Sequence, residues 1–426
     1  MRHANSSTVV LIFLMLLLLL LFRAFLIGYR IDLIRVEAAE IFQYRCFPAI
    51  FSFGDDWADT GNAQALYPAH LEAENLPYGM TYFGKPAHRL SDGRLLIDFF
   101  AQAFGMPFLN SYAVGIVPSL RHGVNFAVAG TTASSLTLQV PYPLSLQVDW
   151  LYKFRLDVMA ALNQPEVTQP LPENDNFQNG LYIVSSGLND YRHAFVSQNL
   201  SVAQAVELVP SIVSRINATI QVILKAGGAK YIMVMNLPPL GCSPEFLTLF
   251  ASLDTNDYDA AGCLKLYNTV AQLHNQLLNN SLQVIRSSLN ATSELGRKVI
   301  AYVDYYQLMF DVIENPQAHG LEVALQACCG SNGPYNYNAT VPCGKEVLRD
   351  DGTTITATVC SDPSSFVSWD GIHTTEAFNS YAAKNILAGN YTLPADDSQS
   401  LFASCPLNFA MQSQCSEVGG LNFGCI

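Results

Sequence analysis

Four short apolar runs, separated by long helical patterns, constrain the fold of this chain more than any other feature. The runs are PAIFSFGD (48–55), LYIVSSG (181–187), KYIMVMNLPPLG (230–241) and KVIAYVDYY (298–306). Near-continuous apolar strands that alternate with helices are typical of a parallel sheet covered on both faces. The pattern therefore predicts an α/β fold with a mostly parallel sheet, and a ligand site beyond the carboxyl ends of its strands.

Three segments between these runs have the apolar spacing of helices. The first begins at a capping Ser91 or Asp92 and stops at Gly105. The second covers 201–228, with an interruption expected at Pro210, and the third covers 264–285. His274 lies inside the third segment, where we expect a structural histidine.

Length and composition allow a large core and argue against nucleic acid as a partner. The chain has 426 residues, of which 50% are hydrophobic and 13% charged. This suits one large α/β domain or two smaller ones. Its formal net charge is −13, and a nucleic-acid partner requires clustered Lys and Arg, which the sequence does not have.

The N-terminus predicts entry into the secretory pathway. The apolar run VVLIFLMLLLLLLF (9–22) follows Arg2 and His3, as in a signal peptide, and VEAAE (36–40) offers small residues for cleavage. The alternative is an uncleaved signal anchor, because the apolar stretch continues past Arg23 to Gly28 and is about long enough to span a bilayer. We therefore expect residues 1–39 to be a signal peptide or anchor, and the protein to be secreted. It is membrane-bound only if this segment is retained.

Cysteines and glycosylation sequons agree with that compartment. Ten cysteines follow the apolar segment, three of them in the last 22 residues, and no matched pair of CxxC motifs indicates zinc. We therefore expect disulfides and a cysteine-containing extension at 391–426. Six N-x-S/T sequons predict a glycosylated surface, at Asn199, Asn217, Asn279, Asn290, Asn338 and Asn390.

Four separated motifs carry the functional signal. They are FGDDWADTGN after the first apolar run, GVNFAVAGTTA (123–133), SSGLNDY (185–191) and WDGIHTTEAFNSYAA (369–383). Their order and content resemble the plant-type, secreted branch of the GDSL, or SGNH, esterase and lipase family. NLPPLGC (236–242) and FGKPAHRLSDGRLLIDFFAQAFG (83–105) add to the resemblance, which extends from Ala49 to Leu387.

The resemblance implies a three-layer α/β/α hydrolase domain at 47–390 that cleaves carboxylic esters of small molecules or lipids, without a metal or cofactor. In such a site an imidazole activates a serine, a carboxylate orients the imidazole, and N–H donors hold the oxyanion. His373 would be the base and Asp370 its orienting carboxylate. Asn189 and the backbone of Gly130 would be the oxyanion donors, with Gly123 of the same motif as the alternative to Gly130. A monomer is the default, because no sequence signal indicates an oligomer.

The chain departs from the family pattern at the nucleophile. Where the family has Gly-Asp-Ser-Leu, this sequence has Gly54, Asp55, Asp56 and Trp57. A carboxylate at that position would raise the pKa of His373 and repel charge that develops on a substrate carbonyl. We therefore expect weak or absent acyl-enzyme chemistry. Ser52 and Ser91 are not expected to meet His373, since one lies in a strand pattern and the other at a helix start.

Several alternatives stay open at this level. Asp56 could act as a general base on water, or the protein could be a non-catalytic binder of an acylated sugar, lipid or phenolic ester. DDWAD also matches the D-D-x-x-D pattern of Mg²⁺-dependent enzymes, but that chemistry needs a helix and a second acidic motif, and here the cluster follows a strand. Taken singly, Asn189 with Asp190 could form only a turn, Gly130 could only permit a tight loop, and Asp370 with His373 could only cap a helix.

Overall fold

The computed structural model describes residues 46–67, 71–115, 119–134, 140–164, 170–290, 298–393 and 401–402. The chain divides into two compact units, Met1–Arg45 and Cys46–Ile426, and the described residues belong to the second. The predicted signal peptide or anchor lies outside the described residues. Among the residues that are described, no helix is long and apolar enough to cross a membrane.

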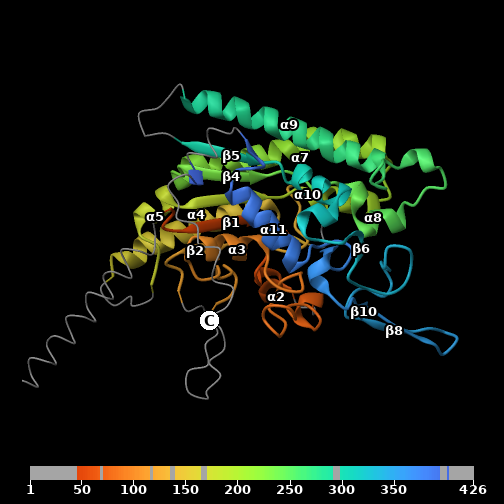
Figure 1. Ribbon diagram of the computed structural model, residues 1–426. Coiled ribbons are helices and arrows are strands. Elements are labelled where there is room, and N and C mark those ends of the chain that lie inside the picture. The colour runs from red at the N-terminus through yellow and green to blue at the C-terminus, as the bar shows by residue number, and fades with distance from the viewer. Residues whose placement is uncertain are drawn as a thin grey trace, which may run out of the picture. The chain divides into compact units, whose positions relative to one another are not determined.

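A six-stranded sheet forms the centre of the second unit (Figure 1). Its strand order is β12-β5-β4-β3-β1-β2, and all neighbours are parallel except β12, which pairs antiparallel with β5. The strands are β1 (Ile50–Gly54), β2 (Gly123–Asn125), β3 (Leu181–Ser185), β4 (Tyr231–Met235), β5 (Val299–Val303) and β12 (Thr392–Leu393). The predicted mostly parallel sheet is confirmed, and four of its strands begin within the predicted apolar runs.

Helices cover both faces of this sheet, which confirms the three-layer α/β/α fold. They are α2 (Asn62–Leu66), α3 (Leu96–Ala103), α4 (Leu144–Leu162), α5 (Asn174–Asn179), α6 (Leu188–Arg192), α7 (Val202–Val222), α8 (Pro244–Leu249), α9 (Lys265–Asn290), α10 (Tyr305–Glu314) and α11 (Glu376–Leu387). Helices α4, α7 and α9 pack on one face, where α7 and α9 lie side by side, and α3 packs with α11 on the other (Figure 1).

Alternation along β1 separates the two faces. Phe51 and Phe53 enter the core under α4, α7 and α9, and Ser52 between them points to the side of α3. The parallel register places Gly54, Ser185 and Met235 next to one another at the carboxyl ends of their strands. The loops that follow these ends therefore meet at one edge of the sheet.

The interruption predicted at Pro210 is wrong. Pro210 lies inside the continuous helix α7, and its side chain is exposed. Proline removes one N–H donor from the helix. On the solvent face, water can hydrogen-bond to the carbonyl that this donor would have reached, so the buried face keeps its packing.

Three two-stranded sheets and two disulfides organise the segment between α10 and α11, and a third disulfide lies before α9. The sheets pair β6 (Val323–Ala327) with β11 (Phe366–Ser368), β7 (Cys329–Gly330) with β10 (Thr358–Val359), and β8 (Glu346–Leu348) with β9 (Thr354–Thr356). The disulfides join Cys242 to Cys263, Cys328 to Cys360, and Cys329 to Cys343, and Cys46 is also disulfide-bonded. Disulfides are thus confirmed, whereas the last three cysteines lie outside the described residues.

The start of the C-terminal segment is part of the fold. Thr392 and Leu393 form the edge strand β12, and Phe402 packs its ring against Phe47 and Phe104. The limits of the hydrolase domain, 47–390, and of the cysteine-containing extension, 391–426, remain a prediction.

Candidate active site

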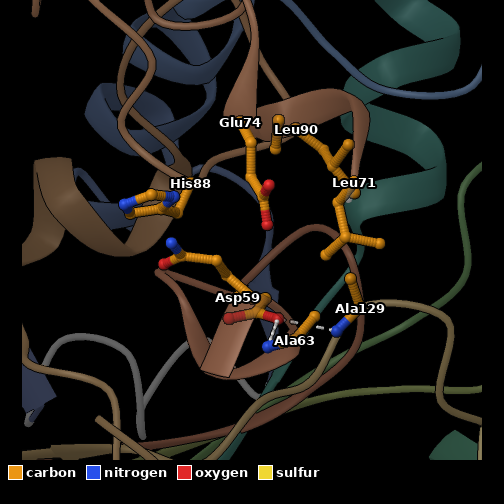
Figure 2. Close-up of a pocket in the computed structure, with 9 residues that line it drawn as sticks. Asp59, Ala63, Leu71, Glu74, His88, Leu90 and Ala129 are labelled. Carbon is orange, nitrogen blue, oxygen red and sulfur yellow. Dashed lines mark hydrogen bonds between the residues drawn. The ribbon is translucent and has the colours of Figure 1, made fainter. Parts of the chain in front are cut away.

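The loop after β1 turns sharply and is fixed by a carboxylate. Gly54 has a φ of +148°, and a Cβ there would lie 2.0 Å from the carbonyl oxygen of Ser185, so the strand can end in this way only with glycine. The buried Asp59 carboxylate accepts four backbone N–H groups, at 2.6–2.9 Å, from Gly61, Asn62, Ala63 and Ala129. Two of these bonds are visible in Figure 2. Asp59 therefore holds the loop in place and is not aimed at a substrate.

The loop after β3 is fixed in a similar way. Asp190, in the first turn of α6, is buried and accepts the N–H groups of Ala133 (2.8 Å) and Ser134 (2.9 Å). Its neighbour Asn189 donates to the carbonyl oxygen of Thr131 at 3.1 Å. The third motif of the sequence thus docks on the second motif.

The third loop, before α11, carries the predicted histidine and aspartate. The distance from His373 Nδ1 to Asp370 Oδ2 is 2.6 Å. The other oxygen of Asp370 accepts the N–H groups of Ile372 (3.0 Å) and His373 (2.8 Å). The hydroxyl of Tyr78 donates to Asp370 Oδ2 at 2.8 Å. Asp370 thus orients the imidazole of His373, and His373 Nε2 points away from Asp370.

Asp56 is the point where the three loops meet. One of its oxygens lies 3.6 Å from His373 Nε2, which is an ion-pair distance rather than a hydrogen bond. The side-chain amide of Asn189 donates to the other oxygen. The structure therefore brings Asp56, His373, Asp370 and Asn189 together from separate parts of the sequence.

The two candidate glycines lie at different ends of the sheet. Gly123 is the first residue of β2 and pairs with Ile50 at the start of β1, and a Cβ there would lie 1.8 Å from the carbonyl oxygen of Ile50. Its role is therefore close strand packing. Gly130 has a φ of +80° and directly precedes Thr131, which contacts Asn189. Gly130 is thus the one that adjoins the site, and its role as an oxyanion donor remains a prediction.

Charges at the site are strongly coupled. Burial opposes the charged form of His373, but Asp370 and Asp56 outweigh it and raise the pKa of His373 to about 10. Burial likewise opposes ionisation of Asp56, yet His373, Arg192 and Asn189 hold its pKa below the ordinary range. Despite burial, His373 also lowers the pKa of Asp370 to about 2. At neutral pH the site is therefore an imidazolium between two carboxylates.

Sequence reasoning missed an ion pair that supports Asn189. Arg192, one turn further along α6, donates to the amide oxygen of Asn189 at 3.2 Å and pairs with Glu245 at 2.6 Å. Tyr337 donates to the same Glu245 at 3.1 Å, and the N–H of Glu245 donates to the carbonyl of Gly371. This network fixes which side of the Asn189 amide faces Asp56, and it ties α6 to the His373 loop. The sequence did not indicate the role of Tyr78 either, because its hydrogen-bond partner, Asp370, lies 292 residues away in the chain.

The three aspartates of DDWAD do not converge on a common ligand. Asp59 faces a small pocket whose other wall carries Glu74 and His88 (Figure 2), but its oxygens are already taken by backbone N–H groups. Among the described residues, no group of three or more His, Cys, Asp or Glu side chains could hold a metal ion. Ser91 donates to the carbonyl of Thr374 at 2.9 Å, and the buried Ser52 hydroxyl has no hydrogen-bond partner among the described residues.

The three-layer α/β/α fold brings a histidine (His373), carboxylates and the amide donor Asn189 together beyond the strand ends of its sheet. This arrangement is typical of a hydrolase. A family model described as GDSL-like Lipase/Acylhydrolase matches residues 50–386, and the chain belongs to this family. A GDSL esterase/lipase of Arabidopsis thaliana is 38% identical over 82% of this chain and 89% of its own length. An esterase of Hevea brasiliensis is 36% identical over 82% and 87% of the two chains. Both names describe ester hydrolases, in agreement with the predicted reaction class.

The family does not by itself fix the substrate. A relative named alpha-L-fucosidase 3, from Arabidopsis thaliana, is 32% identical over 85% of this chain and 96% of its own length. The substrate class must therefore be argued from this chain's own residues.

Proposed function

We propose that this protein is a secreted, monomeric GDSL-family hydrolase for carboxylic esters, with turnover greatly reduced by Asp56 at the nucleophile position. The observation that carries the proposal is the pairing of Asp56 with both His373 and Asn189. These are the groups that would otherwise activate a nucleophile and hold an oxyanion. Attack by Asp56 itself would form an anhydride, which gives no advantage unless water cleaves it rapidly.

Residual hydrolysis would go through water rather than an acyl-enzyme. An imidazolium with a pKa of about 10 holds its proton at neutral pH and is a poor base. The Asp56 carboxylate faces both His373 and Asn189, but its lowered pKa makes it a weak base as well. Removal of the nucleophile from comparable triads lowers turnover by roughly 10⁴ to 10⁶, and the remaining site keeps about 10³ over water.

A second candidate is a binding protein that holds esters without cleaving them. The specific observation in its favour is that the Asn189 amide already has the Asp56 carboxylate as acceptor, so a developing oxyanion would compete with a permanent anion. The protein is secreted and glycosylated under both proposals, the slow hydrolase and the ester-binding protein. Among the sequons whose exposure the structure describes, Asn199 and Asn390 are exposed and accessible to a glycan.

The test compares the wild-type protein with Asp56→Ser and Asp56→Ala on short-chain 4-nitrophenyl esters. We expect Asp56→Ser to gain at least about 10³ in kcat/KM, because it restores an activatable hydroxyl next to His373. It should also label with a fluorophosphonate, which the wild type should not. Wild-type turnover equal to that of Asp56→Ser would overturn the proposal.

The Asp56→Ala variant separates the two candidates. If the wild type hydrolyses esters slowly and Asp56→Ala does not, Asp56 assists water. If neither exceeds buffer while Asp56→Ser is active, the native protein is the ester-binding form.

A further inference from the structure

The ion pair of Arg192 and Glu245 connects two parts of the site that lie far apart in the sequence. Glu245 is 2% exposed, and its two oxygens accept from Nε and Nη2 of the guanidinium, at 2.6 and 2.9 Å. The remaining nitrogen, Nη1, donates to the amide oxygen of Asn189 at 3.2 Å. The backbone N–H of Glu245 donates to the carbonyl of Gly371 at 3.1 Å, shortly before His373 in the chain. One buried residue therefore links the amide donor to the histidine loop.

Tyr337 contacts the same two parts of the site. Its hydroxyl donates to Glu245 at 3.1 Å. Its ring packs on Gly371 so closely that a Cβ at this glycine would lie 2.4 Å from a ring carbon. Tyr337 is 8% exposed and belongs to the segment that the Cys329–Cys343 disulfide closes. Arg192, Glu245 and Tyr337 are called here the Glu245 bridge.

Stability alone does not explain a buried pair of this kind. Taking two charges out of water costs free energy, and well-packed apolar side chains of similar volume are often as good or better. What the pair supplies is geometry, because two parallel bonds between a guanidinium and a carboxylate allow few arrangements. In the arrangement of this protein, Nη1 of Arg192 is directed at Asn189.

The bond from Arg192 favours one of the two orientations of the Asn189 amide. If the amide were turned end for end, its NH2 group would face the guanidinium, donor against donor. In the observed orientation the NH2 group donates to Asp56 and to the carbonyl of Thr131. The Asp56 carboxylate favours the same orientation, but a hydroxyl in its place could both donate and accept. With a serine there, Arg192 and the Thr131 carbonyl would set the direction of the amide.

We propose that Glu245 and Tyr337 are positioning residues of the hydrolytic site. Through Arg192 they aim the Asn189 amide, and they hold the His373 loop opposite it. An oxyanion donor and a base must address the same reacting carbon, and a misplacement of about 1 Å can cost about 10²-fold in rate. The inference rests on the proposed ester hydrolysis and adds the residues that align its two catalytic groups.

The test replaces both charges of the bridge together, because removal of one would leave the other buried and unpaired. Arg192→Met/Glu245→Met, called here the bridge variant, keeps similar volume, so its thermal midpoint should be unchanged or higher. The matched control is Arg89→Met/Asp98→Met, which removes another buried pair with two parallel bonds, both 2.8 Å, at the start of α3. This control shows what the loss of such a pair does to the fold alone.

The first readout is the Asn189 amide itself, measured without turnover. The background is Asp56→Ala, which removes the permanent acceptor of this amide. The full secreted protein carries ¹⁵N-labelled asparagine, NMR follows the exchange of side-chain amide protons with water, and Asn189→Asp assigns the signal. We expect the Asn189 protons to exchange about fivefold to tenfold faster in the bridge variant, the effect of about one hydrogen bond. The buried Asn62 amide, which donates to two backbone carbonyls at 2.8 Å, is the internal reference and should keep its rate.

The second readout is kinetic and uses the Asp56→Ser background. The bridge variant should lower kcat at least about tenfold and leave KM little changed, because the amide and the base act in the transition state. Tyr337→Phe loses only the bond to Glu245 and keeps its ring on Gly371, so kcat should fall by less, about threefold. Arg89→Met/Asp98→Met should change neither kcat nor KM.

Three results would overturn the inference. They are an unchanged exchange rate of Asn189 in the bridge variant, an equal acceleration at Asn189 and Asn62, and a loss of kcat as large in the Arg89→Met/Asp98→Met control. The exchange measurement decides the role of the bridge whether or not Asp56→Ser hydrolyses esters. If Asp56→Ser shows no turnover, the proposed function fails, and this failure is distinguishable from a failure of the inference.

Discussion

The loops after β1 and β3 are built on the same plan but differ in charge. Each carries one buried aspartate, Asp59 or Asp190, that accepts backbone N–H groups from the segment 129–134. Each also presents one polar residue to the site, Asp56 from the first loop and Asn189 from the second, and these two contact one another. The groups that hold the loops are thus separate from the groups that face a substrate. A change at position 56 can therefore alter the chemistry and leave the architecture intact.

The largest effect should come from removing an anchoring carboxylate. Asp59→Ala leaves four buried N–H donors without their acceptor, and at about 1 kcal/mol each the free energy of unfolding should fall by about 4 kcal/mol. Denaturant unfolding with the disulfides intact measures this. Asp59→Asn should lose less, because its amide oxygen still accepts. Asp351→Ala, on an exposed turn, is the control and should hardly change. If Asp59→Ala lowers the free energy of unfolding no more than Asp351→Ala does, the distinction between residues that anchor the loops and residues that face a substrate is wrong.

The sequence predicted the residues that face the site better than the residues that anchor the loops. Asp56, Asn189, Asp370 and His373 were predicted to form one site because they occur in short motifs in the order of the family, and the structure brings the four side chains together. Asp59 and Asp190 belong to the same motifs, but their acceptor roles involve backbone N–H groups up to 70 residues away. Tyr78 is 292 residues from Asp370. Such contacts depend on the packing of loops, which no local spacing encodes.

Asp56→Asn removes the charge difference between the loops after β1 and β3, because each loop then presents an amide side chain to the site. The wild-type His373 pKa is raised to about 10 by Asp370 and Asp56 despite burial, so the pKa should fall in this variant. NMR of the histidine ring protons measures it, with His373→Gln for assignment. A pKa unchanged by Asp56→Asn would show that the charge on the first loop does not act on His373.

The same pKa shift predicts how stability depends on pH. A folded-state pKa above the ordinary 6.5 means that the folded protein binds a proton more tightly than the unfolded chain. The stabilisation is complete below about pH 6.5 and is lost as pH rises towards 10. Between pH 7 and 10 the free energy of unfolding of the wild type should therefore fall more than that of Asp56→Asn, by about 1 kcal/mol or more. Equal slopes would contradict this sign.

The smallest expected effect concerns Tyr78, which supports the third loop as Asp59 and Asp190 support the first two. Its hydroxyl donates to the Asp370 oxygen that also faces His373 Nδ1, so Tyr78→Phe should loosen the orientation of the imidazole. In the Asp56→Ser background, kcat should fall about threefold to tenfold with KM little changed, because one hydrogen bond of about 1 kcal/mol is lost. Tyr182→Phe is the matched control, since its buried hydroxyl donates to the carbonyl of Phe177 at 2.7 Å, away from the site. Both variants should lose similar stability, but only Tyr78→Phe should slow turnover. If the two slow it equally, Tyr78 acts on the fold as a whole, and the third loop lacks the separate anchor that the first two have.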